Sequence, residues 1–232
     1  MLKLRSVATG YGDAQALFGI DLDVAAGEVV TLLGRNGMGK TTTIRAIMGL
    51  LPLWQGEILF GDNNLSTMPA YLRARTGLGL VPEGRLIFPT LTVEENLIAT
   101  QADRFNVNRW SLTRIYQVFP RLAERKRNRG NELSGGEQQM LAIGRALMTN
   151  PKLIILDEAT EGLAPLIRQD IWSCIQSLKA EGEAILLIDK TLQAMTRIAD
   201  KHVVLEKGRV VWSGSNAEFL ADPSIVERHL HV

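Results

Sequence analysis

The stretch GRNGMGKT at residues 34–41 constrains this sequence more than any other feature. It matches the pattern GxxxxGK(S/T), and it stands between an uninterrupted apolar run at 29–33 and an amphipathic segment. The glycines let successive backbone N–H groups curl around a phosphate, and the start of the following helix adds partial positive charge. The stretch therefore predicts a phosphate-binding loop between a buried strand and a helix of an α/β fold.

Every residue of this loop is a candidate ligand for nucleotide phosphate. The Lys40 ammonium would reach the terminal phosphates, and the Thr41 hydroxyl would ligate Mg²⁺. The alternative is an ordinary glycine-rich turn, against which the flanking strand and helix argue. The candidate phosphate ligands are Gly34, Arg35, Asn36, Gly37, Met38, Gly39, Lys40, Thr41 and Thr42.

A second motif, LIILDE at residues 153–158, is an apolar strand that ends in two carboxylates. Parallel strands bring their C-terminal ends to one edge of a sheet, where ligands of doubly wound folds bind. Asp157 would hold the hydration shell of Mg²⁺, and Glu158 would orient and deprotonate an attacking water. The alternative is a solvated acidic turn, but the phosphate loop upstream favours the functional interpretation.

A third motif, LSGGEQQ at residues 133–139, has the capping-box spacing of Ser134 and Glu137 at a helix start. A capping box does not explain two glycines in the first turn, each of which costs roughly 1 kcal/mol relative to alanine. Close approach of the backbone to an anion explains them better. We therefore predict a second phosphate-binding helix start made by Ser134, Gly135 and Gly136.

The remaining pattern predicts an α/β fold with a mainly parallel core sheet and an N-terminal antiparallel part. Period-two alternation at 2–7 and 18–24 indicates paired antiparallel strands, and the helix after the phosphate loop carries Ile44, Ile47, Met48 and Leu51 on one face and stops before Pro52. Further strands are expected at 57–60, 77–81, 153–156 and 184–188, with a hairpin formed by 203–205 and 210–212.

The segment between about 90 and 150 is typical of helices. Thr92 and Glu95 form a capping box, and Ile115, Phe119 and Leu122 lie on one helical face. We therefore expect one domain over 1–232, with its core and antiparallel strands at about 1–90 and 151–232 and a helical subdomain at about 91–150.

Composition narrows the possible partners and the compartment. The chain has 26 Lys and Arg against 25 Asp and Glu, so no overall field recruits nucleic acid, and the basic segment 121–129 is expected to be a solvated surface. The single Cys174 lies in an apolar periodic stretch and is expected to be a packed side chain. No apolar run approaches the ~18 residues that cross a bilayer, and a signal-peptide core is not seen, so we expect a reducing, cytosolic setting.

The order and spacing of GRNGMGKT, LSGGEQQ and LIILDE resemble those of ATP-binding cassette (ABC) ATPases over essentially the whole chain. The resemblance implies an ATPase that uses ATP and Mg²⁺ and dimerises head to tail with a second cassette, identical or different. It also implies separate transmembrane permease subunits, an external solute-binding protein and a peripheral position on the cytoplasmic face of the inner (plasma) membrane.

Two smaller family positions concern the nucleotide and the metal. Tyr11 matches the aromatic that stacks on adenine, although a tyrosine in a turn is the alternative. Glu83 stands where most relatives carry a glutamine near Mg²⁺. Glu83 can still offer an oxygen to the metal, but its charge adds to those of Asp157 and Glu158.

Three further positions depart from the family pattern. Lys190 replaces the switch histidine, and it either binds the γ-phosphate or only makes a surface ion pair. Ala164 replaces an aspartate, and Glu161 stands where a serine is frequent. The combination is similar to cassettes that serve branched-chain amino-acid, amide and urea importers.

Other classes remain as alternatives to the importer subunit. A soluble ABC protein acting on ribosomes or DNA would carry two cassettes or a long coiled coil, and a weakly hydrolysing regulatory cassette would fit Glu83, Lys190 and Ala164. A small GTPase is disfavoured because the sequence has no N/T-K-x-D motif.

Overall fold

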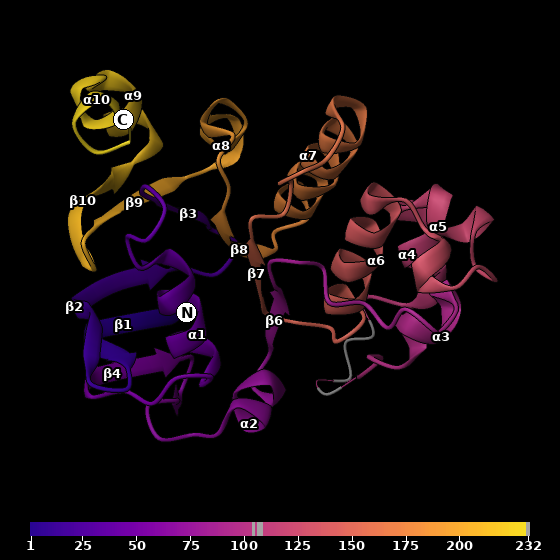
Figure 1. Ribbon diagram of the computed structural model, residues 1–232, viewed down its shortest axis with the longest axis horizontal. Coiled ribbons are helices and arrows are strands. Elements are labelled where there is room, and N and C mark those ends of the chain that lie inside the picture. Colours follow the sequence, from indigo (N-terminus) through magenta and orange to yellow (C-terminus); the bar gives the residue numbers. More distant parts are fainter. Residues whose placement is uncertain (104, 106–108, 231–232) are drawn as a thin grey trace.

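The computed structural model describes residues 1–103, 105 and 109–230, and a mainly parallel sheet forms its centre (Figure 1). The strand order is β10-β9-β3-β8-β7-β6, and only β9 and β10 pair antiparallel. Every residue of β3, β7 and β8 is buried, which explains why their sequences are apolar apart from Thr31 and Asp157. The strands are β3 (Val29–Leu33), β6 (Leu78–Val81), β7 (Leu153–Asp157), β8 (Ala184–Ile188), β9 (Lys201–Glu206) and β10 (Arg209–Ser215).

A second, antiparallel sheet packs beside the first at the N-terminal side of the molecule (Figure 1). Its order is β2 (Ala14–Val24), β1 (Leu2–Tyr11), β4 (Gln55–Phe60) and β5 (Asn63–Asn64). Leu4 pairs with Leu22 on one neighbour and with Ile58 on the other, and all three side chains are buried. The predicted antiparallel pair and the C-terminal hairpin are both confirmed.

The helix after the phosphate loop, α1 (Lys40–Met48), is shorter than its apolar pattern predicted. We expected the helix to include Leu51 and to stop before Pro52, but Gly49 ends it by adopting a left-handed φ of 72°. The Gly49 N–H then bonds back to the carbonyl groups of Ala46 and Arg45. Glycine commonly ends helices in this way because it lacks the Cβ that disfavours positive φ.

The predicted helical segment forms a separate group of short helices around α6 (Figure 1). The capping box of Thr92 and Glu95 is confirmed, but Ile115, Phe119 and Leu122 do not lie on one helix. Pro120 breaks the segment because proline disfavours helical backbone at the residue before it, and Phe119 is non-helical at φ −123° and ψ 76°. The elements are α3 (Val93–Ile98), α4 (Leu112–Val118), α5 (Pro120–Glu124), η1 (Gly130–Glu132) and α6 (Gly135–Leu147).

Four further helices follow the strands of the C-terminal half, and α2 (Ala70–Arg75) precedes β6. They are α7 (Pro165–Ala180), α8 (Leu192–Ile198), α9 (Asn216–Ala221) and α10 (Ser224–His229). Cys174 is buried on α7, as its apolar setting predicted. None of the helices in the described part of the chain is both long and apolar enough to span a membrane. Since β3, β6, β7 and β8 are parallel, the loops that follow them gather at one edge of the sheet.

Candidate functional site

The loop after β3 has a backbone that only glycine permits at two points. Gly34 has φ 144°, and a Cβ there would lie 2.4 Å from the Leu205 carbonyl oxygen. Gly39 has φ 105°, and a Cβ there would lie 2.8 Å from Leu17 Cδ2. The loop is thus pressed against β2 and β9, and its curl depends on the absence of side chains at these positions.

The side chain of Lys40 folds back over this loop. Its Nζ donates to the carbonyl oxygens of Gly34 at 2.8 Å and Arg35 at 3.0 Å. Burial lowers the pKa of Lys40, while Glu158 and Asp157 oppose that change by stabilising its charge. Within the described residues, no side chain caps the start of α1. The first amides of α1 and the lysine therefore provide donors and positive charge at one place.

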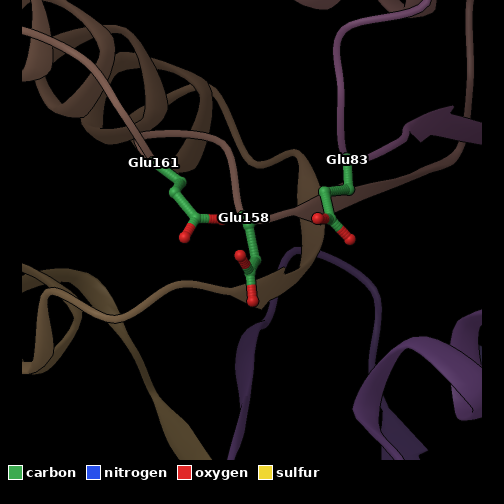
Figure 2. A group of neighbouring side chains, drawn as sticks. All are labelled: Glu83, Glu158 and Glu161. Carbon is green, nitrogen blue, oxygen red and sulfur yellow. The ribbon is translucent and has the colours of Figure 1, made fainter. Parts of the chain in front are cut away.

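A cavity of about 370 Å³ opens over the loop. Four residues from distant parts of the sequence line this cavity together with the loop. Glu83 follows β6, Glu158 and Glu161 follow β7, and Lys190 follows β8. Figure 2 shows Glu158 between Glu83 and Glu161, and carboxylate oxygens of the three lie within 4.8 Å of one another. The loop residues that line the cavity are Asn36, Gly37, Gly39, Lys40, Thr41 and Thr42.

Asp157 ends β7 and is buried, with 3% of its surface exposed. Its Oδ1 atom has no hydrogen-bond partner among the described residues. Burial raises its pKa to about 6, the charge of Glu83 adds to the rise, and a hydrogen bond with Thr41 opposes it. A buried carboxylate oxygen without a partner beside a threonine hydroxyl matches the preference of Mg²⁺ for oxygen ligands.

Glu158 is held in a left-handed backbone conformation with φ 52°, and its N–H donates to the Ile188 carbonyl oxygen at 2.8 Å. A hydrogen bond shared with Glu161 and burial together raise its pKa to about 7, and Lys190 opposes the rise. The position therefore holds a carboxyl group that gains and loses its proton near neutral pH, as a general base requires.

Lys190 forms ion pairs with two glutamates in this structure. Its Nζ contacts Glu161 closely and lies 3.5 Å from Glu158. The hydrogen bond with Glu161 is the main cause that raises the pKa of Lys190, so its ammonium stays charged. The ion pair is thus one of the two predicted contacts of Lys190, and the ammonium lies on the phosphate-loop cavity.

Tyr11 lies at the end of β1 and is 43% exposed. Its hydroxyl is 3.3 Å from Thr42 Oγ1 and accepts a hydrogen bond from Arg45 at 3.2 Å. These contacts anchor the phenol to α1 and leave much of the side chain accessible to a ligand.

The third motif forms the start of α6, outside the cavity of the phosphate loop. Its capping box is confirmed, because Ser134 Oγ accepts from the Glu137 N–H and Glu137 accepts from the Ser134 N–H. Gly136 also has a packing reason that sequence reasoning missed. A Cβ at Gly136 would lie 2.3 Å from Ile167 Cγ2 of α7, and one at Gly135 would lie 2.9 Å from Arg85 Nη1.

Two other contributions to the site were missed from sequence. The sequence indicates Glu161 only as a departure from the family pattern, yet in the structure it contacts both Glu158 and Lys190. Asp189 Oδ2 accepts hydrogen bonds from the Thr160 N–H at 3.0 Å and hydroxyl at 2.6 Å. These bonds tie the loop after β7 to the loop after β8. The sequence did contain a signal for Asp189, because this carboxylate directly follows the buried strand β8.

Comparison with known proteins agrees with this geometry. A family model described as ABC transporter matches residues 17–161. The high-affinity branched-chain amino acid transport ATP-binding protein BraG of Pseudomonas aeruginosa is 41% identical, with 99% of each chain covered. The lipopolysaccharide export system ATP-binding protein LptB of Escherichia coli is 31% identical over 99% of this chain and 96% of its own. A solved ATP-binding subunit of an ABC transporter has a TM-score of 0.83 at 30% identity, over 95% of this chain and 92% of its own.

The fold and the site define a nucleotide-binding α/β protein in which a phosphate loop faces acidic strand ends. The chain belongs to the ABC transporter family, and it is an ATP-hydrolysing subunit of such a transporter.

Proposed function

We propose that this subunit energises the import of branched-chain amino acids or related amides. The observation that carries the proposal is the 41% identity to BraG over nearly the full length of both chains. The export protein LptB is 31% identical, so the import assignment rests on the nearer of these two relatives. The combination of Glu83, Glu161 and Ala164 supports the same importer type.

In this proposal the chain's own residues divide the work on ATP. Lys40 and the loop amides hold the phosphates, Tyr11 stacks on the adenine, and Glu158 accepts a proton from the attacking water. Lys190 exchanges its glutamate partners for the γ-phosphate. Because phosphoryl transfer needs little covalent help from the protein, positioning and charge provide most of the catalysis.

Residues at two strand ends and at the start of α1 fit a magnesium ion. Thr41, Asp157 and Glu83 would hold it, and the partnerless oxygen of Asp157 supports this set. When bound, Mg²⁺ neutralises charge on the phosphate oxygens. Burial and the charge of Glu83 raise the pKa of Asp157, and Thr41, Lys40 and Arg45 oppose the rise, so a further bound cation would favour the charged carboxylate.

The proposal also includes a second half-site for ATP, at the start of α6, and the partner proteins of the transporter. Ser134, Gly135 and Gly136 would close over ATP held by a second cassette, identical or different, in a head-to-tail dimer. Separate transmembrane subunits would form the pore, and an external solute-binding protein would deliver the solute. The subunit would lie peripherally on the cytoplasmic face of the inner membrane.

A second candidate is a regulatory cassette that hydrolyses weakly. The contact of Lys190 with Glu158 favours it, because an ion-paired base is a poorer proton acceptor. Turnover by the chain alone, and by the chain mixed with a second cassette from the same cells, separates the two candidates. Strong turnover by the chain alone would rule out the regulatory role.

The test of the proposed function is purification of the tagged chain from a mild-detergent extract of its own cells, with identification of the proteins that come with it. We expect polytopic membrane proteins and a second cassette. Reconstituted in vesicles with those proteins, the complex should drive uptake of a branched-chain amino acid or amide, and a Lys40→Ala complex should not. Recovery of ribosomal or DNA-repair proteins alone would overturn the transporter assignment.

A further inference from the structure

A cavity larger than the one over the phosphate loop lies between the group of short helices and α7. Its volume is about 600 Å³, and none of its lining residues lines the phosphate-loop cavity. The walls come from α4, from the start of α5, from α6 and from α7, which lies beside this group of helices in Figure 1. Pockets of this size between helices commonly hold small organic ligands. The groups that line this one therefore indicate what it binds.

The break between α4 and α5 supplies backbone acceptors to the cavity. Pro120 has no N–H to donate to the helix before it, and the Leu122 N–H donates to the Phe119 carbonyl oxygen at 2.9 Å. Within the described part of the chain, the carbonyl oxygens of Gln117 and Val118 therefore accept no hydrogen bond, and both residues line the cavity. The last carbonyl groups of a helix carry partial negative charge, so this wall attracts a cation.

Two opposite charges lie at the rim of the cavity without forming a close pair. Arg121 Nη2 of α5 is 3.6 Å from Asp170 Oδ2 of α7, which is longer than a normal N–H···O hydrogen bond. Each of these side chains is about half exposed. Glu181, the other carboxylate of the lining, is already paired with Arg114. Arg121 and Asp170 therefore offer both charges to a ligand at one place.

The floor of the cavity is apolar. Phe119, Met140 and Cys174 line it, and each is only 3–5% exposed. Burial raises the pKa of the Cys174 thiol to about 12, so this side chain stays neutral and contributes to the apolar surface. Such a floor favours an aliphatic group, because covering it removes apolar surface of both partners from water.

The short distance between the two rim charges restricts the ligand. A free amino acid carries its ammonium and its carboxylate on one carbon atom, whereas the two charged ends of a peptide are farther apart. A simple anion would use only Arg121, and a simple cation only Asp170. A zwitterion with an aliphatic side chain uses both charges and the floor.

We propose that this cavity binds a free amino acid with an aliphatic side chain. Its carboxylate pairs with Arg121, its ammonium lies between Asp170 and the carbonyl oxygens at the end of α4, and its side chain packs on the apolar floor. The site goes beyond the proposed function, because none of its residues takes part in the work on ATP. Under that function, its ligand belongs to the chemical class of the transported solute.

The first experiment titrates L-leucine into the whole, nucleotide-free chain and follows the backbone amide signals by NMR. We expect saturable shifts at residues 117–121 and 170–181, with a dissociation constant on the order of 0.1–1 mM for a small ligand at a partly exposed site. Signals of residues 36–42 should not move, since the two cavities share no residue. Glycine, which has no side chain for the floor, should bind roughly tenfold more weakly.

Two analogues of leucine test the two charges separately. Leucine amide lacks the carboxylate, 4-methylpentanoate lacks the ammonium, and each should bind roughly tenfold more weakly than leucine. Arg121→Met should weaken leucine binding and remove the advantage of leucine over leucine amide. Asp170→Asn should instead remove its advantage over 4-methylpentanoate. General damage to the fold would not produce these two separate losses of preference.

Two further variants serve as controls. Arg127→Met removes an exposed cation of the same basic segment that does not line the cavity, so leucine affinity should stay within about twofold. Ser173→Phe introduces a large side chain into the cavity from an exposed position of α7 and should abolish the leucine shifts. Thermal unfolding of each variant verifies that it is folded.

The absence of shifts at residues 117–121 and 170–181 with leucine at about 10 mM would overturn the proposal. Equal weakening of leucine binding by Arg121→Met and Arg127→Met would overturn it as well. These results are distinguishable from a failure of the proposed function, because leucine binding is measured on the chain alone, without transport. A chain that binds leucine but is recovered from cells without membrane proteins would overturn only the proposed function.

Discussion

The two helices that follow glycine-containing motifs begin in different ways. Gly39 precedes α1, no side chain of the described residues caps the helix, and its first turn holds a lysine without any acidic residue. Ser134 precedes α6, where it accepts from the Glu137 N–H while Glu137 accepts from the Ser134 N–H at 2.8 Å. One helix start therefore has unsatisfied donors and a cation, whereas the other is already capped and carries a carboxylate.

Because of this difference, we expect the two helix starts to bind phosphate under different conditions. We expect the start of α1 to hold an anion without help, since its first residues and Lys40 line the same cavity. The start of α6 must compete with its own cap and with the charge of Glu137. We therefore expect it to bind phosphate only when a partner cassette presents ATP together with its bound cation.

The largest effect should come from Glu158, the proposed catalytic base. Glu158→Gln keeps the size of the side chain and removes the proton acceptor, so turnover should fall ~10²-fold or more while ATP binding is retained. Steady-state turnover and equilibrium nucleotide binding measure the two quantities. Glu124→Gln, a change at an exposed acid of α5, is the matched control and should be silent. Near-normal turnover of Glu158→Gln would remove Glu158 from its assigned role.

A somewhat smaller effect, on the affinity for ATP, should distinguish the start of α1 from the start of α6. Lys40→Ala should weaken ATP binding to the isolated chain roughly tenfold to a hundredfold, because it removes charge-assisted contacts to phosphate. Ser134→Ala should leave that affinity within about twofold and lower only the turnover of the dimer. Calorimetric titration of the chain at concentrations where it is monomeric gives both affinities. If Ser134→Ala weakened binding as much as Lys40→Ala, the two starts would not differ as argued.

The pH dependence of kcat/KM should reveal the groups around Glu158, since that parameter reports pKa values of the free enzyme. The pKa of Glu158 is raised to about 7, and a base works only when deprotonated, so kcat/KM should fall as pH drops below about 7. Glu161→Gln removes the main cause of the rise and should move this limb to lower pH. Lys190→Met removes an opposing cation and should move it to higher pH. Shifts in the same direction would contradict the assignment.

The features of both helix starts that the sequence predicted correctly are local ones. The phosphate loop and the ends of β7 and β8 are local features, since each depends on a strand and the residues directly after it. The capping boxes at Thr92 and Ser134 are equally local, and both are present. Two predicted helices differ because a single residue overrode the apolar pattern, at Gly49 and at Pro120.

Contacts between distant segments could not be predicted in the same way. Gly136 has little room for a side chain because Ile167 of α7 packs on it, and the end of the Arg85 side chain lies against Gly135, and neither neighbour is close in sequence. The pairing of Lys190 with Glu161 likewise depends on how the loops after β7 and β8 meet. Periodicity and spacing identify elements and motifs, whereas these contacts depend on the packing between elements.

The smallest predicted effect tests the cap of α6 in the chain without its partner. Ser134→Ala should lower the free energy of unfolding by about 1 kcal/mol, the usual contribution of an N-cap side chain. Urea denaturation measures the change, and Ser177→Ala at an exposed position of α7 is the control, which should be neutral or slightly stabilising because alanine favours helix. A loss of stability would show that the Ser134 hydroxyl is occupied by its own helix before a partner arrives. Phosphate would then have to displace that hydrogen bond, so the half-site at α6 would engage later than the one at α1. No loss of stability would remove this competition, and only the charge of Glu137 would then oppose phosphate binding at the start of α6.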